Sequence, residues 1–387
     1  MQELNAFWQK LSQALLLFAI IFHLGFASPQ ASLPTLLPSA PPDAVLAKPE
    51  APLECRAQEL LEMMTLQEKV GQMFFIRCPA AGVAAQISQY HPGGLILFAL
   101  NFEQETPRSI QAAITGWQTL SEIPLWVGTD EEGGDVVRVS QFPQYEHSRF
   151  PSPQTLRTAG GLDAAAADAK EKSTFLLSLG INVNFAPVAD VSLDNGDYIH
   201  NRTWGADASA TADYVSVVLQ EMEAAGISGV LKHFPGYGNC EDTHGAIVHD
   251  ERPREIFETA DLLPFARGIE ANADFVLVSH NIVDAFDATL PASLSPAVHE
   301  LLRDELGFDG IIITDDLAMS GVAAITDAGE AAVQAVLAGN DMLLSTDYPT
   351  QIKAVLAAVE AGRINMAQID DAVRRILRQK LRAGLLS

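Results

Sequence analysis

Cysteine is scarce in this sequence of 387 residues, which contains only Cys55, Cys78 and Cys240. Their irregular spacing, without a CxxC pair, excludes a disulfide framework and a zinc ribbon and leaves room for one disulfide at most. Basic residues are also few. The chain has 24 Lys and Arg residues and 49 Asp and Glu residues, which give a net charge of -25. Such a chain repels phosphate backbones and anionic lipid surfaces, so we expect no nucleic acid partner.

The first residues differ in composition from the rest. Lys10 precedes an apolar run, ALLLFAIIFHLGFA, which has the length of a signal-peptide core and is short for a membrane span. Residues 1–27 are therefore expected to be a signal peptide or a membrane anchor, and the protein to be exported, with membrane contact only through this segment. A cytoplasmic apolar helix is the alternative, because one Lys makes a weak start for a signal peptide.

Residues 28–54 are expected to form a Pro/Ala-rich linker. Seven of the chain's 21 prolines lie between residues 28 and 53, and proline stiffens the backbone and removes hydrogen-bond donors. The remaining residues, 55–387, are expected to form a single catalytic domain.

Short apolar runs recur through this domain, at residues 72–77, 93–99, 124–130, 181–187, 229–234, 273–280, 310–316 and 341–346. Segments with helical spacing separate many of them, including 107–122, 212–226, 254–271 and 330–339. This alternation predicts a (β/α)₈ TIM-type barrel. A doubly wound open sheet is the rival fold, but the residues after the first run, FFIRCPAAGV, lack its usual GxGxxG loop.

Polar residues end these apolar runs: Arg77, Asn101, Asp130, Asp190, Lys232, His233, His280, Asp315 and Asp316. In a barrel the carboxyl ends of the strands face one rim, where active sites lie. Each residue alone has a simpler explanation, since a carboxylate after a strand often caps the next helix and a histidine often bonds to a backbone carbonyl. Their convergence is what indicates a site.

The segment KHFPGYGNCEDTHGAIVHD, residues 232–250, holds three of the chain's nine histidines. Asp242 and His244 are two residues apart, and a carboxylate beside an imidazole suits a general acid/base near neutral pH. The flanking glycines Gly236, Gly238 and Gly245 indicate a loop that can move. A solvated surface loop is one alternative. A zinc site of His233, Asp242 and His244 is another, although no HExxH helix or thiolate pair supports it.

Several motifs together resemble those of glycoside hydrolase family 3. They are KHFPGYG followed by DTH, TDEEGGDVVR (129–138), NFAPVADV (184–191), NRTWG (201–205) and ELGFDGIIITDDLAM (305–319). Within the family the sequence is most similar to the single-domain bacterial β-N-acetylglucosaminidases, over residues 56–385. The resemblance implies a (β/α)₈ barrel, in agreement with the strand pattern.

The resemblance also implies a role for each matching residue. Asp315 matches the nucleophile, His244 the acid/base and Asp242 its partner, whereas Asp316 supports the following helix. Asp130, Arg202, Lys232 and His233 match residues that bind sugar hydroxyls. The implied enzyme is a monomeric, retaining, exo-acting β-N-acetylhexosaminidase that needs no cofactor or metal and acts on a small carbohydrate, a fragment of cell-wall peptidoglycan or of chitin.

The sequence departs from the family at three positions. Tyr237 stands where related sequences often have His, and Glu131 and Asp135 stand where we expect Gln and Arg. The added negative charge predicts weaker binding of an aglycone that carries a carboxylate. Three other functions stay open: a β-N-acetylglucosaminide phosphorylase, a β-glucosidase or β-xylosidase, and a non-catalytic sugar-binding protein.

Overall fold

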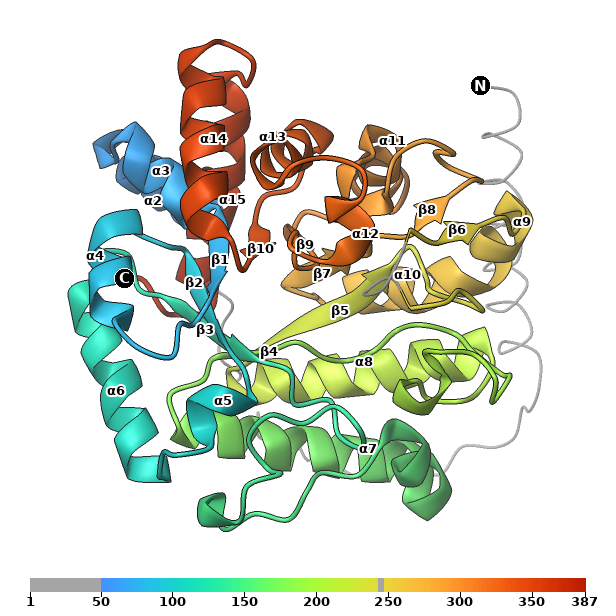
Figure 1. Cartoon of the computed structure of the whole chain (residues 1–387). Helices are drawn as coiled ribbons and strands as arrows, with labels where there is room; N and C mark the ends of the chain where they lie inside the picture. The colour runs from blue at the N-terminus through green and yellow to red at the C-terminus, as the bar shows by residue number, and fades with distance from the viewer. Residues whose placement is uncertain (1–49, 243–246) are drawn as a thin grey trace, which may run out of the picture. The chain divides into compact units, whose positions relative to one another are not determined.

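All the predicted strands are present in the computed structural model, which describes residues 50–242 and 247–387 (Figure 1). They are β1 (Phe74–Arg77), β2 (Gly94–Leu97), β3 (Trp126–Thr129), β4 (Val183–Asn184), β5 (Ser228–Phe234), β7 (Phe275–Val278), β9 (Ile311–Thr314) and β10 (Leu343–Ser345). They form one 8-stranded parallel sheet in the order β10-β1-β2-β3-β4-β5-β7-β9. Nearly all their residues are buried, as expected for parallel strands covered on both faces. The predicted barrel is confirmed.

The ring closes between β9 and β10 through few contacts. An isolated parallel bridge joins Ile313 to Met342, and the Thr314 N–H donates to the Met342 carbonyl at 3.2 Å. This seam lies beside the residues that follow β9. A separate two-stranded sheet, β6 (His249–Asp250) with β8 (Ile282–Val283), was not predicted.

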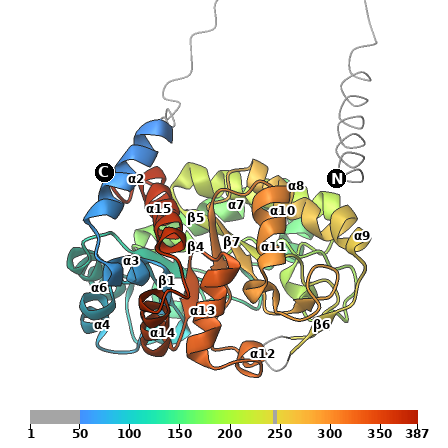
Figure 2. The same ribbon diagram turned by 90° about the horizontal axis from the view of Figure 1, so that it is seen from above.

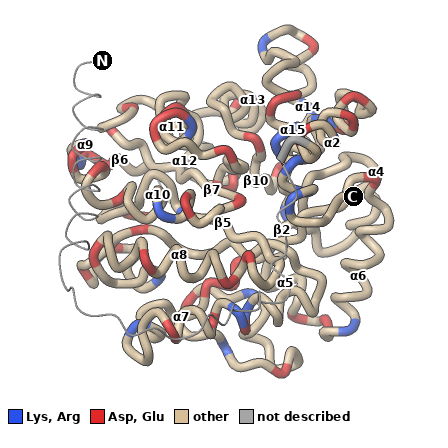
Figure 3. Tube along the Cα trace, turned by 180° about the vertical axis from the view of Figure 1, so that it is seen from behind, with Lys and Arg blue, Asp and Glu red and all other residues tan. Residues whose placement is uncertain are grey.

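Helices surround the strands in both views (Figures 1 and 2). They are α2 (Glu50–Met63), α3 (Leu66–Gln72), α4 (Val83–Tyr90), α5 (Ala99–Phe102), α6 (Pro107–Leu120), α7 (Pro153–Ser178), α8 (Ala208–Ala225), α9 (Arg254–Ile256), α10 (Leu262–Glu270), α11 (Pro296–Glu300), α12 (Ser320–Ala323), α13 (Ala328–Ala338), α14 (Tyr348–Glu360) and α15 (Met366–Arg382). Thr106, Asp207 and Asp327 cap α6, α8 and α13 by accepting hydrogen bonds from backbone N–H groups of the first turn. Charged residues of both signs are spread over these outer elements (Figure 3).

The start of the domain lies earlier than expected. Helix α2 begins at Glu50, and Leu53 is buried in the core, so the end of the predicted 28–54 linker belongs to this helix. The predicted signal peptide or anchor, residues 1–27, lies outside the described residues. No helix within 50–242 or 247–387 is long and apolar enough to cross a membrane. All three cysteines are free thiols in the structure.

Aromatic rings fill the barrel beneath its carboxyl end. Phe75 and Phe185 meet edge to face with ring centroids 5.3 Å apart, as do Trp126 and Phe275 at 5.3 Å. Gly128 makes this packing possible, because a Cβ there would lie 2.7 Å from the Phe185 ring. The rings give the cleft above them a dry, rigid floor.

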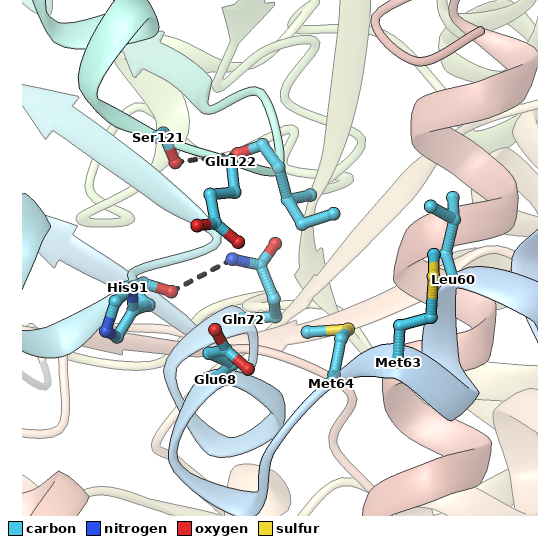
Figure 4. A pocket seen from close by; sticks show the side chains of 9 residues that line it. Leu60, Met63, Met64, Glu68, Gln72, His91, Ser121 and Glu122 are labelled. Atoms are coloured by element: carbon cyan, nitrogen blue, oxygen red, sulfur yellow. Dashed lines mark hydrogen bonds between the residues drawn. The ribbon is translucent and has the colours of Figure 1, made fainter.

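A hollow of about 230 Å³ lies at the opposite end of the barrel, before β1, β2 and β3 (Figure 4). Leu60, Met63 and Met64 line one side, and the Gln72 side chain donates to the His91 carbonyl at 2.9 Å across it. None of the predicted site residues lies here.

Lys380 on α15 is fully buried next to this hollow. Its Nζ donates to Gln72 Oε1 at 2.8 Å and to the Gly93 carbonyl at 2.9 Å. No carboxylate forms an ion pair with it in the described part of the chain, so burial lowers the pKa of Lys380 well below its ordinary value.

The free energy of unfolding should therefore rise with pH because of the lowered pKa of Lys380. The unfolded chain keeps the ordinary lysine pKa of about 10.4, so between the two pKa values the unfolded state binds more protons. Unfolding then costs up to about 1.4 kcal/mol more per pH unit. Lys380→Met removes this term, and urea denaturation at about pH 7 and about pH 9 should show a smaller rise for the variant than for the wild type. Lys353→Met, at an exposed position on α14, is the control. Identical slopes for the wild type and Lys380→Met would mean that Lys380 stays charged in the folded state.

Candidate active site

A cleft of about 590 Å³ opens at the carboxyl ends of the strands. Each strand, or the residue directly after it, contributes to the lining: Arg77, Ile96, Asp130, Phe185, Lys232, His233, Leu277, Asp315 and Leu344. The predicted convergence of strand-end residues on one rim is thus present. Among the predicted sugar-binding residues, Asp130, Arg202, Lys232 and His233 all line this cleft.

Glu132 lies at the centre of a buried ionic network in the cleft. Its carboxylate is 2.6 Å from Lys232 Nζ, and it accepts two hydrogen bonds from Arg202, from Nε at 2.9 Å and Nη2 at 2.8 Å. Lys232 also donates to Asp130 at 2.9 Å. Burial alone would raise the pKa of Glu132, but Arg202 and Lys232 outweigh it and hold that pKa well below its usual range.

His233 is held by partners on both ring nitrogens. Nδ1 lies 2.8 Å from an oxygen of the buried Asp190, and Nε2 lies 3.2 Å from Arg202 Nη2. Because a guanidinium only donates, Nε2 accepts and the ring proton sits on Nδ1. Asp190 also accepts from the backbone N–H groups of His233 and Tyr237, at 3.1 Å and 2.7 Å. The role of Asp190 is therefore to orient His233.

The two acids after β9 differ in their surroundings. Asp316 accepts from the backbone N–H groups of Ala318 and Thr346, at 3.0 Å and 3.1 Å, and from the Thr346 hydroxyl. It therefore links the end of β9 to the residue after β10, and supports the following segment as expected. Asp315 lines the cleft and accepts from the Asp316 N–H at 2.8 Å.

Asp242 is half-buried and accepts a hydrogen bond from the Tyr198 hydroxyl. Burial raises the pKa of the Tyr198 hydroxyl, and the negative charges of Asp242 and Asp315 add to the rise. The two acids therefore act electrostatically on the same side chain, which lines the cleft. His244, the predicted acid/base, lies outside the described residues.

Arg252 anchors the loop that leads to Asp242. Its Nη2 donates to Asp250 at 2.7 Å, its Nη1 to Asp261 at 3.0 Å, and Nη2 also reaches the Gly236 carbonyl at 3.4 Å. Gly238 has a φ of +52°, and a Cβ there would lie 2.1 Å from Arg252 Cζ. Gly236 and Gly238 thus serve close packing in this structure, whereas Gly245 lies outside the described residues.

Other residues singled out in the sequence have structural roles. Asn101 accepts from the Phe98 N–H at 2.9 Å at the start of α5, and the buried His280 contacts Ser293 Oγ at 2.7 Å. Glu131 is fully buried and accepts from the N–H groups of residues 138, 139 and 140. It does not line the cleft, so the expected negative charge at the rim is wrong for Glu131, and the exposed Asp135 faces a neighbouring groove.

Sequence reasoning missed Glu132, Tyr198 and Arg138, which all line the cleft. The sequence position of Glu132 could have predicted its place in the cleft. Glu132 lies two residues after Asp130, and side chains two residues apart in an extended chain face the same side. Tyr198 lies in a loop with no periodic pattern.

The alternative zinc site of His233, Asp242 and His244 is described only in part, because His244 lies outside the described residues. Within 50–242 and 247–387, no group of at least three His, Cys, Asp or Glu side chains is arranged to hold a metal ion. Both ring nitrogens of His233, one ligand of the alternative zinc site, already have partners.

Comparisons with known proteins agree with this geometry. The glycosyl hydrolase family 3 N-terminal domain matches residues 65–379. A beta-hexosaminidase of Alkalilimnicola ehrlichii is 34% identical over 276 residues, which cover 69% of this chain and 77% of that protein. The barrel and its cleft are those of a glycoside hydrolase, and the chain belongs to glycoside hydrolase family 3.

Solved structures extend the similarity. A family 3 β-N-acetylglucosaminidase from a Paenibacillus species has a TM-score of 0.78 and 34% identity, covering 83% of this chain and 63% of its own. A β-N-acetylhexosaminidase from Beutenbergia cavernae has a TM-score of 0.73 and 30% identity, covering 81% of this chain and 98% of its own.

The ionic network predicts a large effect for Glu132→Gln. The change leaves Arg202 and Lys232 buried with one carboxylate fewer, and we expect a loss of about 3 kcal/mol in the free energy of unfolding. Urea denaturation at about pH 7 measures it, with Asp135→Asn, an exposed change in the same loop, as control. Equal stability of the two variants would show that the network does not depend on Glu132.

Proposed function

We propose that this chain is a retaining, exo-acting β-N-acetylhexosaminidase that removes terminal β-linked N-acetylglucosamine. The observation that carries the proposal is the position of Asp315 in the cleft, across from the network of Asp130, Lys232 and Arg202. In the sheet order β3-β4-β5-β7-β9, the strands preceding Asp130 and Asp315 lie on opposite sides of the eight-strand ring. A single sugar ring held between them would present its hydroxyls to one side and its anomeric carbon to the other.

The names of the related proteins support the substrate. The similar proteins from Alkalilimnicola ehrlichii and Beutenbergia cavernae are named a beta-hexosaminidase and a β-N-acetylhexosaminidase. The proposed substrates are fragments of cell-wall peptidoglycan or of chitin, whose terminal sugars are N-acetylated.

In the proposed mechanism, Asp315 attacks the anomeric carbon and forms a covalent glycosyl-enzyme. His244 donates a proton to the leaving oxygen and then removes one from the attacking water. Asp242 stabilises the protonated imidazole, because a nearby carboxylate favours the charged form. The network of Lys232, Glu132 and Arg202 holds its charges in fixed positions before the sugar binds, so little reorganisation is needed in the transition state.

A panel of nitrophenyl β-glycosides tests this function. The N-acetylglucosaminide should be hydrolysed with a higher kcat/KM than the glucoside or the xyloside, and added phosphate should not change the rate or the product. Asp315→Asn should abolish turnover of every substrate, because no glycosyl-enzyme can form. Asp135→Asn, outside the cleft, is the matched control and should stay active. Preference for the glucoside, or sugar phosphate as the product, would contradict the proposal.

His244→Ala tests the acid/base. A nitrophenyl group leaves without protonation, so formation of the glycosyl-enzyme should largely survive while its hydrolysis becomes slow. We expect an initial burst of nitrophenol, a low apparent KM, and rescue by azide with formation of a β-glycosyl azide. A disaccharide, whose leaving group needs protonation, should react far more slowly. Wild-type rates on both substrates would remove His244 from the mechanism.

A further inference from the structure

Two charged side chains of α7, Asp168 and Lys172, form an ion pair inside the protein. Lys172 Nζ lies 2.8 Å from Asp168 Oδ2, one helical turn away, and the two residues are only 7% and 9% exposed. Helix α7 packs beside α8 on the outside of the barrel (Figure 1), and neither residue of the pair lines the cleft. The pair therefore does not contact a sugar bound there.

The pair reaches the cleft through the main chain. Lys172 Nζ also donates to the backbone carbonyl of Glu132 at 3.0 Å, and the N–H of Glu132 donates to the Val136 carbonyl at 3.0 Å. The backbone of Glu132 is thus held on both sides, while its carboxylate binds Lys232 and Arg202. A shift of this backbone would move the carboxylate on which both cations depend.

The surroundings of the Lys172 ammonium fix its position. Its Nζ lies 5.1 Å from the centre of the Phe150 ring, and the Phe150 carbonyl accepts from the Gly134 N–H at 2.9 Å. The ammonium therefore lies against a carboxylate, a carbonyl and an aromatic ring. The carbonyl belongs to the loop after β3, and the residue that carries the ring is hydrogen-bonded to the same loop.

Stability alone does not explain an ion pair at this place. Removing two charges from water is costly, and an apolar pair of similar size is often equally stable or more stable. Apolar residues would also match the rest of the buried side of α7, which includes Leu156, Ala165, Ala169 and Leu176. An apolar pair would lack the donor to the Glu132 carbonyl.

We propose that Lys172, oriented by Asp168, is a positioning residue for the sugar-binding network. By fixing the backbone of Glu132, it determines where Lys232 and Arg202 present their remaining donors to the hydroxyl groups of the sugar. This inference rests on the proposed function, because it takes the network to bind the hydroxyls of a terminal sugar.

The alternative is that the pair only holds α7 against the barrel. The two explanations differ in what they predict for substrates that lack one hydroxyl group. If the pair only holds the helix, its loss lowers kcat/KM for every substrate by the same factor. If Lys172 positions the network, its loss and the loss of a hydroxyl bound by the network are not additive, because both remove the same interaction.

The experiment measures kcat/KM in the full-length wild type and in the double variant Asp168→Leu/Lys172→Met. The substrates are nitrophenyl N-acetyl-β-glucosaminide and its analogues that lack the C3, C4 or C6 hydroxyl. The double variant leaves no unpaired charge, so it should unfold at a urea concentration close to that of the wild type. Its kcat/KM for the complete substrate should fall about 10- to 100-fold, because a small displacement of positioning groups causes losses of this size.

The decisive quantity is the loss in kcat/KM caused by each missing hydroxyl. For at least one analogue this loss should be about 3-fold or more smaller in the double variant than in the wild type. Lys69→Met/Asp370→Leu removes a 2.7 Å ion pair between α3 and α15, away from the cleft, and is the matched control. It should leave the loss for each hydroxyl unchanged.

Equal losses for all three hydroxyls in the double variant and the wild type would overturn the inference, as would an unchanged kcat/KM. If the apolar pair does not fold, Asp168→Asn/Lys172→Gln decides by the same criterion, since it is a neutral pair whose amide is shorter than the lysine side chain. A wild type that prefers the glucoside would instead refute the proposed function, and the corresponding analogues of the glucoside would then decide the inference.

Discussion

The arrangement of the cleft depends on one buried carboxylate, that of Glu132. Taking a carboxylate out of water is costly, and here cationic groups offset that cost from more than one side. Lys232 and Arg202 bind its side-chain oxygens, and Lys172 donates to its backbone carbonyl at 3.0 Å. Each of the two side-chain partners then reaches a further group, Lys232 to Asp130 and Arg202 to His233. The positions of five cleft residues, Glu132 included, are thereby tied to one another.

A connected set of this kind favours binding of a polar ligand in a single orientation. Its charges are already desolvated and paired, so a sugar entering the cleft meets fixed donors and acceptors instead of mobile side chains. Asp190 extends the set by fixing the tautomer of His233. The aromatic floor of Phe75 and Phe185 adds rigidity from below.

The sequence was sufficient to predict the barrel, because each strand is a short apolar run and segments with helical periodicity separate many of these runs. It also predicted which strand ends meet, since the carboxyl ends of parallel strands share one rim. The sequence was not sufficient to predict which acidic residues line the cleft. Glu131 and Glu132 are adjacent and chemically identical, yet one accepts hydrogen bonds from the backbone below the cleft and the other holds the cations within it. Only the path of the loop after β3 separates their roles.

The loop glycines show a related limit of sequence reasoning. A glycine-rich segment indicates freedom of the backbone, but Gly238 is required by the closeness of Arg252, which lies 14 residues further along the chain. Contacts between residues distant in sequence are invisible to patterns of composition. The same limit explains why Arg77 was noted as a strand-end residue without any indication that its guanidinium lies over the Phe98 ring.

The hydrogen bonds from Thr346 to Asp316 distinguish the two adjacent acids of the TDD motif, Asp315 and Asp316. Asp316 fastens the two strands at the most sparsely bonded seam of the ring, directly beside the residue proposed to carry out the chemistry. A mutational scan that measures only the enzymatic rate would assign both acids to catalysis. Substitution of Asp316 would loosen the contact between β9 and β10 and displace Asp315, and substitution of Asp315 would remove its carboxylate. Two adjacent aspartates can therefore have different roles, one structural and one chemical. Their positions in the structure distinguish the two roles, whereas the sequence motif does not.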